Sequence, residues 1–380
     1  MSSNINPSSA RSPPSFDINS IDETGQQQGD DKHDAGTYSY KEIGANNTIK
    51  NYVSERSEEF RRLQELRKKG WESEKGDEHF RKQRRSADTA SNKNAEYFYN
   101  MMQGIGKELH RATKAFNLSH TTNQRAILDM CMAPGGFTAS VLKKYPDAQV
   151  RAMSLPVEQG GHEVLLKRDN LAVEFLDVTM LAGDMGLTKD DIPISHPERE
   201  TFILEKKFSP EEKFDLALCD GQVLRTHQRS EWRELYEARR LANSQLALSL
   251  EHLNSGGTMV ILLHKLEAWG SVKLIHTLSK FSTVKLFKHP KCHAMRSSFY
   301  VVARNVHSGG ELALRAIAEW KEGWKIATLG TEEERNRAFQ AGGKEAQEVL
   351  DEFGGRLVAM GRTIWSRQTT GLENAKFMKA

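Results

Sequence analysis

The sequence predicts a doubly wound α/β domain, in which a mostly parallel sheet carries helices on both faces. Short apolar runs alternate with helix-forming amphipathic segments from residue 126 to residue 306, as in the βα units that build parallel sheets. Three of the apolar runs end in an acid, at Asp129, Asp177 and Asp220. Ligands of open α/β sheets bind beyond the carboxyl ends of the strands. We therefore expect a ligand site at that edge.

The first of these units is the segment 126–137. An apolar run at 126–129 leads through small residues to a proline and two glycines at 134–136, and a helical pattern begins at Phe137. Glycine lets the backbone approach a ligand closely, and a helix N-terminus presents unpaired N–H groups. The pattern is typical of a nucleotide-binding turn, although an ordinary strand–helix turn would share it.

The remaining elements follow in order. Strands are expected at 149–155, 172–177, 214–220, 258–264, 284–287 and 298–303. Helices are expected at 137–144, 158–167, 230–253 and 271–281. The run 258–264 is fully apolar, which favours a central position in the sheet. Residues 178–212 are polar and irregular, which predicts a surface insertion with one or two helical turns.

Four regions follow from these patterns. Residues 1–45 contain few aliphatic side chains and are expected to be disordered. Residues 46–94 form a charged helical extension, residues 95–306 the α/β domain, and residues 307–380 a second helical extension. A narrow apolar stripe in the first extension predicts a helix lying on the main domain; its residues are Val53, Phe60, Leu63 and Leu66.

Composition narrows the class of protein. The chain has 380 residues, 38% hydrophobic and 28% charged, and no apolar run approaches the ~18 residues of a membrane helix. No secretory signal is visible. Its three cysteines are widely spaced, which predicts neither a disulfide-linked partner nor a zinc ribbon and favours a reducing, intracellular location, cytoplasmic or nuclear. A net charge of +3 is too small to indicate nucleic-acid binding by itself.

Several motifs carry a resemblance to a known family. The segment 128–137, Leu-Asp-Met-Cys-Met-Ala-Pro-Gly-Gly-Phe, resembles the first motif of FtsJ-like methyltransferases, and 214–221 resembles their fourth. The blocks 256–263, 285–288 and 296–304 resemble the family's C-terminal half. The likeness covers roughly residues 95–306, and the chain is similar to the larger FtsJ-domain proteins of fungi.

The resemblance implies a Rossmann-like methyltransferase sheet, with the last strand antiparallel, that binds S-adenosylmethionine and methylates ribose 2′-hydroxyls of RNA. Asp129 belongs to the first motif, and Asp177 would lie near the adenine. Asp220 would lie beside the transferred methyl group. The cofactor would be cradled by Ala133, Pro134, Gly135, Gly136 and Phe137.

The family's Lys-Asp-Lys-Glu tetrad holds the target hydroxyl and assists its deprotonation. Asp220 stands in register with the aspartate of this tetrad, but Leu262 and Ser298 stand at the second lysine and the glutamate. Lys265 follows three residues later, where the strand is ending, so its side chain can still turn into the site despite facing the other way. For the first lysine we favour Lys107 over Lys114. The predicted catalytic residues are therefore Asp220, Lys265 and Lys107.

Other groups near the same edge remain open to two interpretations. His227 follows Asp220 and is either a substitute base or a solvent-facing loop residue. The basic turn from Lys285 to Arg296 suits phosphates but also fits a solvated turn. No metal site is predicted, because a fourth ligand beside His289, Cys292 and His293 is lacking. Leu262 and Ser298 suggest an alternative to RNA methylation, a catalytically silent module that binds RNA or cofactor. A third possibility keeps methyl transfer but has a small molecule or a protein as the acceptor.

Overall fold

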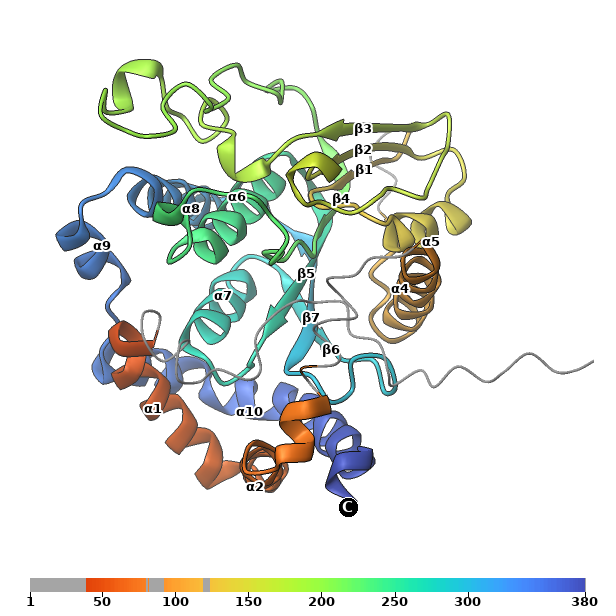
Figure 1. The fold of residues 1–380 in the computed structure, drawn as a ribbon, viewed down its shortest axis with the longest axis vertical. Coiled ribbons are helices and arrows are strands. Elements are labelled where there is room, and N and C mark those ends of the chain that lie inside the picture. The colour runs from red at the N-terminus through yellow and green to blue at the C-terminus, as the bar shows by residue number, and fades with distance from the viewer. Residues whose placement is uncertain (1–38, 80, 82–91, 119–123, 380) are drawn as a thin grey trace, which may run out of the picture.

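The computed structural model describes residues 39–79, 81, 92–118 and 124–379. Its centre is a seven-stranded sheet in the order β3-β2-β1-β4-β5-β7-β6 (Figure 1). The strands are β1 (Ala126–Asp129), β2 (Gln149–Ser154), β3 (Leu171–Phe175), β4 (Phe214–Cys219), β5 (Leu253–His264), β6 (Thr283–Phe287) and β7 (Ser298–Val306). Only the pairs that β7 makes are antiparallel. The predicted doubly wound, mostly parallel sheet with an antiparallel last strand is confirmed.

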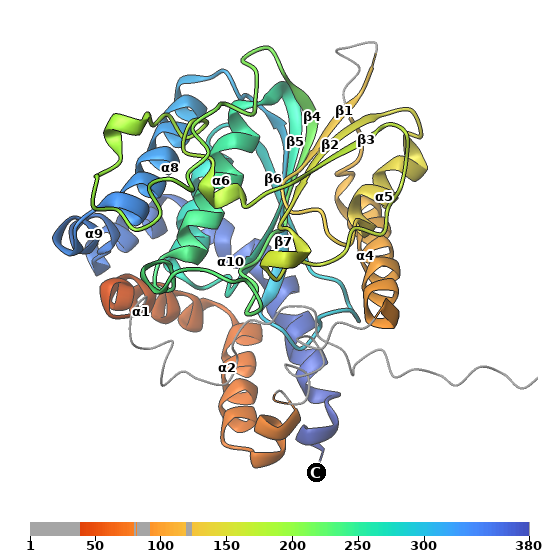
Figure 2. The ribbon, with the colours of Figure 1, turned by 45° about the horizontal axis from the view of Figure 1, so that its top comes forward.

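Helices cover both faces of this sheet, as Figures 1 and 2 show. On one face lie α4 (Asn92–Thr113) and α5 (Gly136–Lys144), packed against each other. On the opposite face lie α6 (Glu237–Glu251) and α7 (Trp269–Ser279), and α8 (Glu311–Leu329) packs on α6. The strand order reverses between β1 and β4, which is the position where doubly wound sheets open a ligand crevice.

The N- and C-terminal helices pack together below the sheet (Figure 1). Both α1 (Ser39–Arg56) and α2 (Glu58–Trp71) contact the long α10 (Gly343–Glu373), and α9 (Glu332–Phe339) leads into it. The predicted apolar stripe is buried here, with Val53, Phe60 and Leu63 at 0% exposure. Helix α1 begins within the segment expected to be disordered; residues 1–38 of that segment lie outside the described residues.

Five short 3₁₀ turns also lie among the described residues. They are η2 (Val157–Gln159), η3 (Val178–Met180), η4 (Lys189–Asp191), η5 (Glu231–Arg233) and η6 (Lys376–Met378). Two predictions are corrected here. The helix expected at 158–167 is only η2, and α6 begins at Glu237, after η5 rather than at Ser230.

A close contact between loops explains the missing helix. Gly160 has a left-handed φ of 89°, and a Cβ there would lie 1.8 Å from the Thr226 carbonyl oxygen. Thr226 Oγ1 donates to the Gly160 carbonyl at 2.7 Å. The chain from Gly160 onward therefore forms a loop against the 222–230 segment.

The segment 178–212 is irregular, as expected, but it is not confined to the surface. Some of its apolar side chains belong to the hydrophobic core cluster that also contains side chains of β4, α6 and α7. They are Leu181, Ile192, Phe202 and Phe208. No helix among the described residues is long and apolar enough to cross a membrane.

Candidate functional site

A cavity of 340 Å³ lies at the carboxyl edge of the sheet, around the switch between β1 and β4. That volume falls in the range of small-molecule sites, about 300–1,000 Å³. Its wall is formed by the segments that follow β1, β2, β3 and β4, by α4, and by side chains of β5 and β7. The edge of the sheet at which a ligand site was predicted therefore contains a cavity.

The glycine turn supports this cavity from behind. Ala133 and Pro134 line it, whereas Gly135, Gly136 and Phe137 do not. Gly135 adopts a left-handed φ of 101°, and a Cβ on Gly136 would lie 2.4 Å from the Tyr99 carbonyl oxygen of α4. The two glycines allow the turn and the approach of α5 to α4. That all five residues cradle the ligand stays a prediction.

Two carboxyl groups at the ends of β1 and β4 form an acidic pair. Asp129 is 2% exposed and accepts a hydrogen bond from Thr138 Oγ1 at 2.5 Å, but its Oδ1 has no partner among the described residues. Asp220 lines the cavity. Burial raises the pKa of both, and the charge of Asp129 raises the pKa of Asp220 further. A cation near this pair would relieve the repulsion.

These features fit S-adenosylmethionine, the cofactor implied by the resemblance. Its sulfonium group is positively charged, and the acidic pair offers a buried, under-compensated negative environment beside the cavity. Ala133, Pro134 and Asp220 would contact the cofactor directly, because they line the cavity. Asp129 lies behind the wall and would act through its charge.

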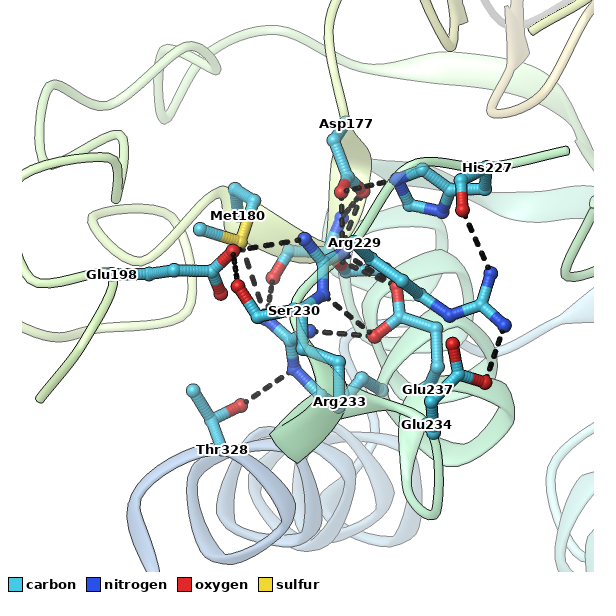
Figure 3. A network of polar contacts seen from close by, with 12 residues as sticks. Asp177, Met180, Glu198, His227, Arg229, Ser230, Arg233, Glu234, Glu237 and Thr328 are labelled. Carbon is cyan, nitrogen blue, oxygen red and sulfur yellow. Dashed lines mark hydrogen bonds and ion pairs between the residues drawn. The ribbon is translucent and has the colours of Figure 1, made fainter. Parts of the chain in front are cut away.

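Asp177 also lines this cavity, and it lies in a dense polar network (Figure 3). Its Oδ1 accepts hydrogen bonds from the backbone N–H and the hydroxyl of Thr179, both at 2.9 Å. Its Oδ2 accepts from Arg233 Nη2 at 2.5 Å and lies 3.4 Å from His227 Nε2. Although burial opposes it, contacts with His227 and Arg233 hold the pKa of Asp177 well below its usual value.

The same network contains a group with the composition of a metal site. One ligand atom each from Asp177, His227 and Glu237 lie within 4.8 Å of one another. The cation among them is the guanidinium of Arg233, which contacts Glu237 Oε1 at 2.6 Å as well as Asp177. Because Arg233 already neutralises both carboxylates, the cluster is an internal ion network.

The structure places the predicted lysines elsewhere. Lys107 and Lys265 are exposed and lie outside the cavity wall. Among the described residues that line the cavity, none is a lysine or an arginine. Leu262 and Tyr300, paired across β5 and β7, occupy that side of the wall instead. The prediction of Lys107 and Lys265 as catalytic residues is therefore not supported by their positions.

The basic turn between β6 and β7 is also partly internal. Lys288 is 2% exposed, and its ammonium donates to the carbonyls of His293, Arg296 and Ser298 at 2.9, 2.6 and 2.8 Å. Arg296 is buried as well. These two residues shape the turn and cannot contact phosphates, which corrects the interpretation of the turn as wholly basic surface.

Several lining residues were not identified from the sequence. They are Asn94, Phe98, Met102, His162, Glu163, Gln222 and Tyr300. Three of them follow one another at intervals of four along α4, the spacing of a single helix face, so this periodicity was a usable signal. The others lie on loops or on the last strand, where the sequence gives no comparable signal.

Comparison with known proteins is consistent with this architecture. The family model of FtsJ-like methyltransferases matches residues 107–306. Ribosomal RNA small subunit methyltransferase B of Citrobacter koseri is 32% identical over 147 residues, which cover 36% of this chain and 29% of that protein. The Escherichia coli protein of the same name is 31% identical over a stretch of equal length and coverage. The chain thus spans under a third of these relatives.

Among solved structures, a ribosomal RNA methyltransferase from Plasmodium falciparum aligns with a TM-score of 0.34 and 13% identity, over 54% of this chain and 96% of that one. An O-methyltransferase family protein from Burkholderia thailandensis aligns with a TM-score of 0.31 and 10% identity, over 58% and 62%. The family match covers more than half of the chain and contains every strand of the sheet. This chain belongs to the FtsJ-like methyltransferase family.

Proposed function

We propose that this protein transfers a methyl group from S-adenosylmethionine to RNA, with the ribose 2′-hydroxyl as acceptor. The observation that carries the proposal is the acidic pair of Asp129 and Asp220 beside a cavity at the switch point of a methyltransferase sheet. When bound, the cofactor supplies an electrophilic methyl group on a sulfonium cation. The residues of this chain bind that cation and prepare the acceptor.

Asp220 is the group best suited to handle the acceptor proton. It lines the cavity, and burial together with Asp129 raises its pKa, which makes it a stronger base than an ordinary aspartate. In its ionised form, the Asp220 carboxylate would accept the proton of an acceptor hydroxyl held in the cavity.

RNA is proposed as the acceptor from the relatives and the family. The two bacterial proteins that this chain resembles are named as ribosomal RNA methyltransferases. Their similarity to this chain extends over 147 residues.

One observation favours a second candidate function. The wall near Asp220 carries Leu262 and Tyr300 where a hydroxyl-activating lysine would be expected. A module that binds the cofactor without transferring methyl would tolerate such a wall. It would bind S-adenosylmethionine but label no acceptor.

The test is a transfer assay with tritiated S-adenosylmethionine and total RNA, followed by digestion and chromatography of the nucleosides. We expect label in a 2′-O-methyl nucleoside, lost in Asp220→Asn and retained in Lys344→Ala, an exposed control on α10. Cofactor binding without label supports the silent module. Label in a methylated base, or in protein, contradicts the ribose acceptor.

A further inference from the structure

The carboxylate of Asp177 is fully engaged by the protein. Thr179 occupies Oδ1 with two hydrogen bonds, and Arg233 and His227 approach Oδ2. Arg233 is itself fixed through Glu237, which also receives Arg240 Nη1 at 2.6 Å. A ligand amine could reach Asp177 only by displacing one of these buried donors. The acid at the end of β3 therefore acts on the cavity indirectly.

His227 is the residue through which it acts. Its side chain is 7% exposed and lines the same cavity as Asp177, so the interpretation as a solvent-facing loop residue is wrong. Figure 3 shows the imidazole directly beside the Asp177 carboxylate. The pair has the arrangement of a carboxylate that orients a histidine ring, the way acids position imidazoles in many sites.

The loop that carries His227 is firmly held. Arg229 Nη1 donates to the carbonyls of Leu224 and His227 at 3.0 and 3.3 Å, and its Nη2 contacts Glu234 at 2.7 Å. On the other side, the Gln228 backbone N–H donates to the Gln159 carbonyl at 3.0 Å. The ring is therefore placed at the cavity before any ligand arrives.

The contact with Asp177 also determines the chemistry of the ring. A neutral imidazole has one N–H donor and one acceptor nitrogen. The carboxylate accepts hydrogen bonds only, so it favours the tautomer with the proton on Nε2, which faces it. Nδ1 is then the acceptor. An acceptor nitrogen suits an exocyclic amine, which donates, and disfavours a carbonyl oxygen at the same position.

We infer that His227, held by Asp177, recognises the 6-amino group of the cofactor's adenine through Nδ1. The inference rests on the proposed use of S-adenosylmethionine and assigns base recognition to a residue outside the glycine turn. In this arrangement Asp177 is a positioning residue, and Arg233 with Thr179 keeps its carboxylate ionised and directed at the ring.

The experiment compares two neutral ligands by calorimetry with the full chain: S-adenosylhomocysteine, and S-inosylhomocysteine, in which a 6-oxo group replaces the 6-amino group. The wild-type protein is expected to bind S-adenosylhomocysteine about tenfold more tightly, because the oxo group would face an acceptor nitrogen. In His227→Ala this ratio is expected to fall to about one.

Two further variants separate recognition from structure. His227→Lys can still donate to Asp177 but has no acceptor atom, so it is expected to lose the preference for S-adenosylhomocysteine while keeping the thermal transition near that of wild type. His307→Ala replaces an exposed histidine outside the cavity and is expected to keep the ratio.

The outcomes that overturn the inference are distinct from failure of the proposed function. If the wild-type protein binds S-adenosylhomocysteine but His227→Ala or His227→Lys keeps the full affinity ratio, His227 does not recognise the 6-amino group. If the wild-type protein binds neither ligand, the proposed cofactor and the inference are both wrong.

Discussion

At the scale of single residues, two carboxyl groups determine the charge of the site. Asp129 and Asp220 end neighbouring strands that are paired in parallel, so the fold forces both acids to the same edge. One is shielded from water, and the other lines the cavity. Their raised pKa values show that burial and mutual repulsion disfavour the ionised carboxylates, and a bound cation would offset this unfavourable energy.

This pair predicts a pH-dependent preference for the charged cofactor. Because the fold raises both pKa values above 3.8, more of the pair is protonated near pH ~5 than near pH ~8. Affinity for cationic S-adenosylmethionine should therefore rise with pH, by up to about tenfold more than affinity for neutral S-adenosylhomocysteine. Calorimetry across that range measures both. Asp220→Asn should flatten the difference, and an unchanged slope in that variant would refute the assignment.

The same shifts have a consequence for the ligand-free protein. The folded protein retains protons on these acids that the unfolded chain releases above pH 3.8. The contribution of this pair to the free energy of unfolding should therefore decrease as pH rises from about 4 toward neutrality. Chemical denaturation of wild type and Asp220→Asn measures this contribution. A steeper loss of stability in the variant than in wild type would contradict it.

Glycine at 136 is required by packing. A Cβ there would lie 2.4 Å from the Tyr99 carbonyl oxygen and 2.6 Å from Met102 Cβ, so Gly136→Ala should destabilise the protein by about 1–3 kcal/mol. Gly104→Ala is a matched control in α4, because a Cβ there meets nothing within 4 Å; it should be neutral or stabilising by up to about 1 kcal/mol. Chemical denaturation compares them, and equal effects would contradict the packing argument.

Residue chemistry was only partly predictable from the sequence. Asp220 was identified because strand ends converge in any doubly wound sheet, and it lines the cavity. Lys265 could not be placed, since it follows the last residue of β5 and has a left-handed φ of 48°. His227 was undecided because its burial depends on Asp177, some fifty residues away in sequence.

At the scale of elements, periodicity predicted the strands well and the loops poorly. Strands are specified locally by apolar runs, and all seven expected strands are present. β5 begins at Leu253, five residues before the expected start and within the segment expected to end a helix. The segment 158–167 has helix-forming residues, but Gly160 lies against Thr226 and breaks the pattern. That contact joins two loops remote in sequence, so local propensity could not predict it.

The β6–β7 turn is an element organised by one buried lysine. Lys288→Met removes the donor for three carbonyls while keeping a similar volume. We expect a loss of about 3 kcal/mol in the free energy of unfolding and faster amide exchange over residues 289–297. Lys285→Met, exposed on β6, is the control and should change stability by no more than about 0.5 kcal/mol. Unchanged exchange in the Lys288 variant would show that the turn is held otherwise.

For the whole molecule, the helical extensions share the core of the sheet. Side chains of α1, α2 and α10 belong to the same buried cluster as α7 and β5. The sequence predicted that the first extension lies on the domain, from a narrow apolar stripe. It could not predict the partner, because α10 lies nearly three hundred residues further along the chain. The division into separate regions at residues 94 and 307 stays a prediction.

Arg67 connects the two helical extensions to the sheet, so its replacement tests whether they are coupled through this side chain. From α2 it contacts Glu267, after β5, at 2.5 Å and Gln368 on α10 at 2.9 Å. Glu267 has a side chain only 4% exposed, and although burial opposes it, the charge of Arg67 lowers its pKa. Arg67→Ala leaves this carboxylate buried without its partner, which should cost about 3 kcal/mol.

The control is Arg62→Ala, which removes an ion pair between α2 and Glu373 with the arginine 64% exposed and should cost at most about 1 kcal/mol. Hydrogen exchange should show loss of protection in both α2 and α10 in the Arg67 variant alone, because one guanidinium fixes both helices to the end of β5. Equal stability losses in the two variants, or protection lost only in α2, would mean that the extensions are coupled to the sheet by apolar packing and not through Arg67.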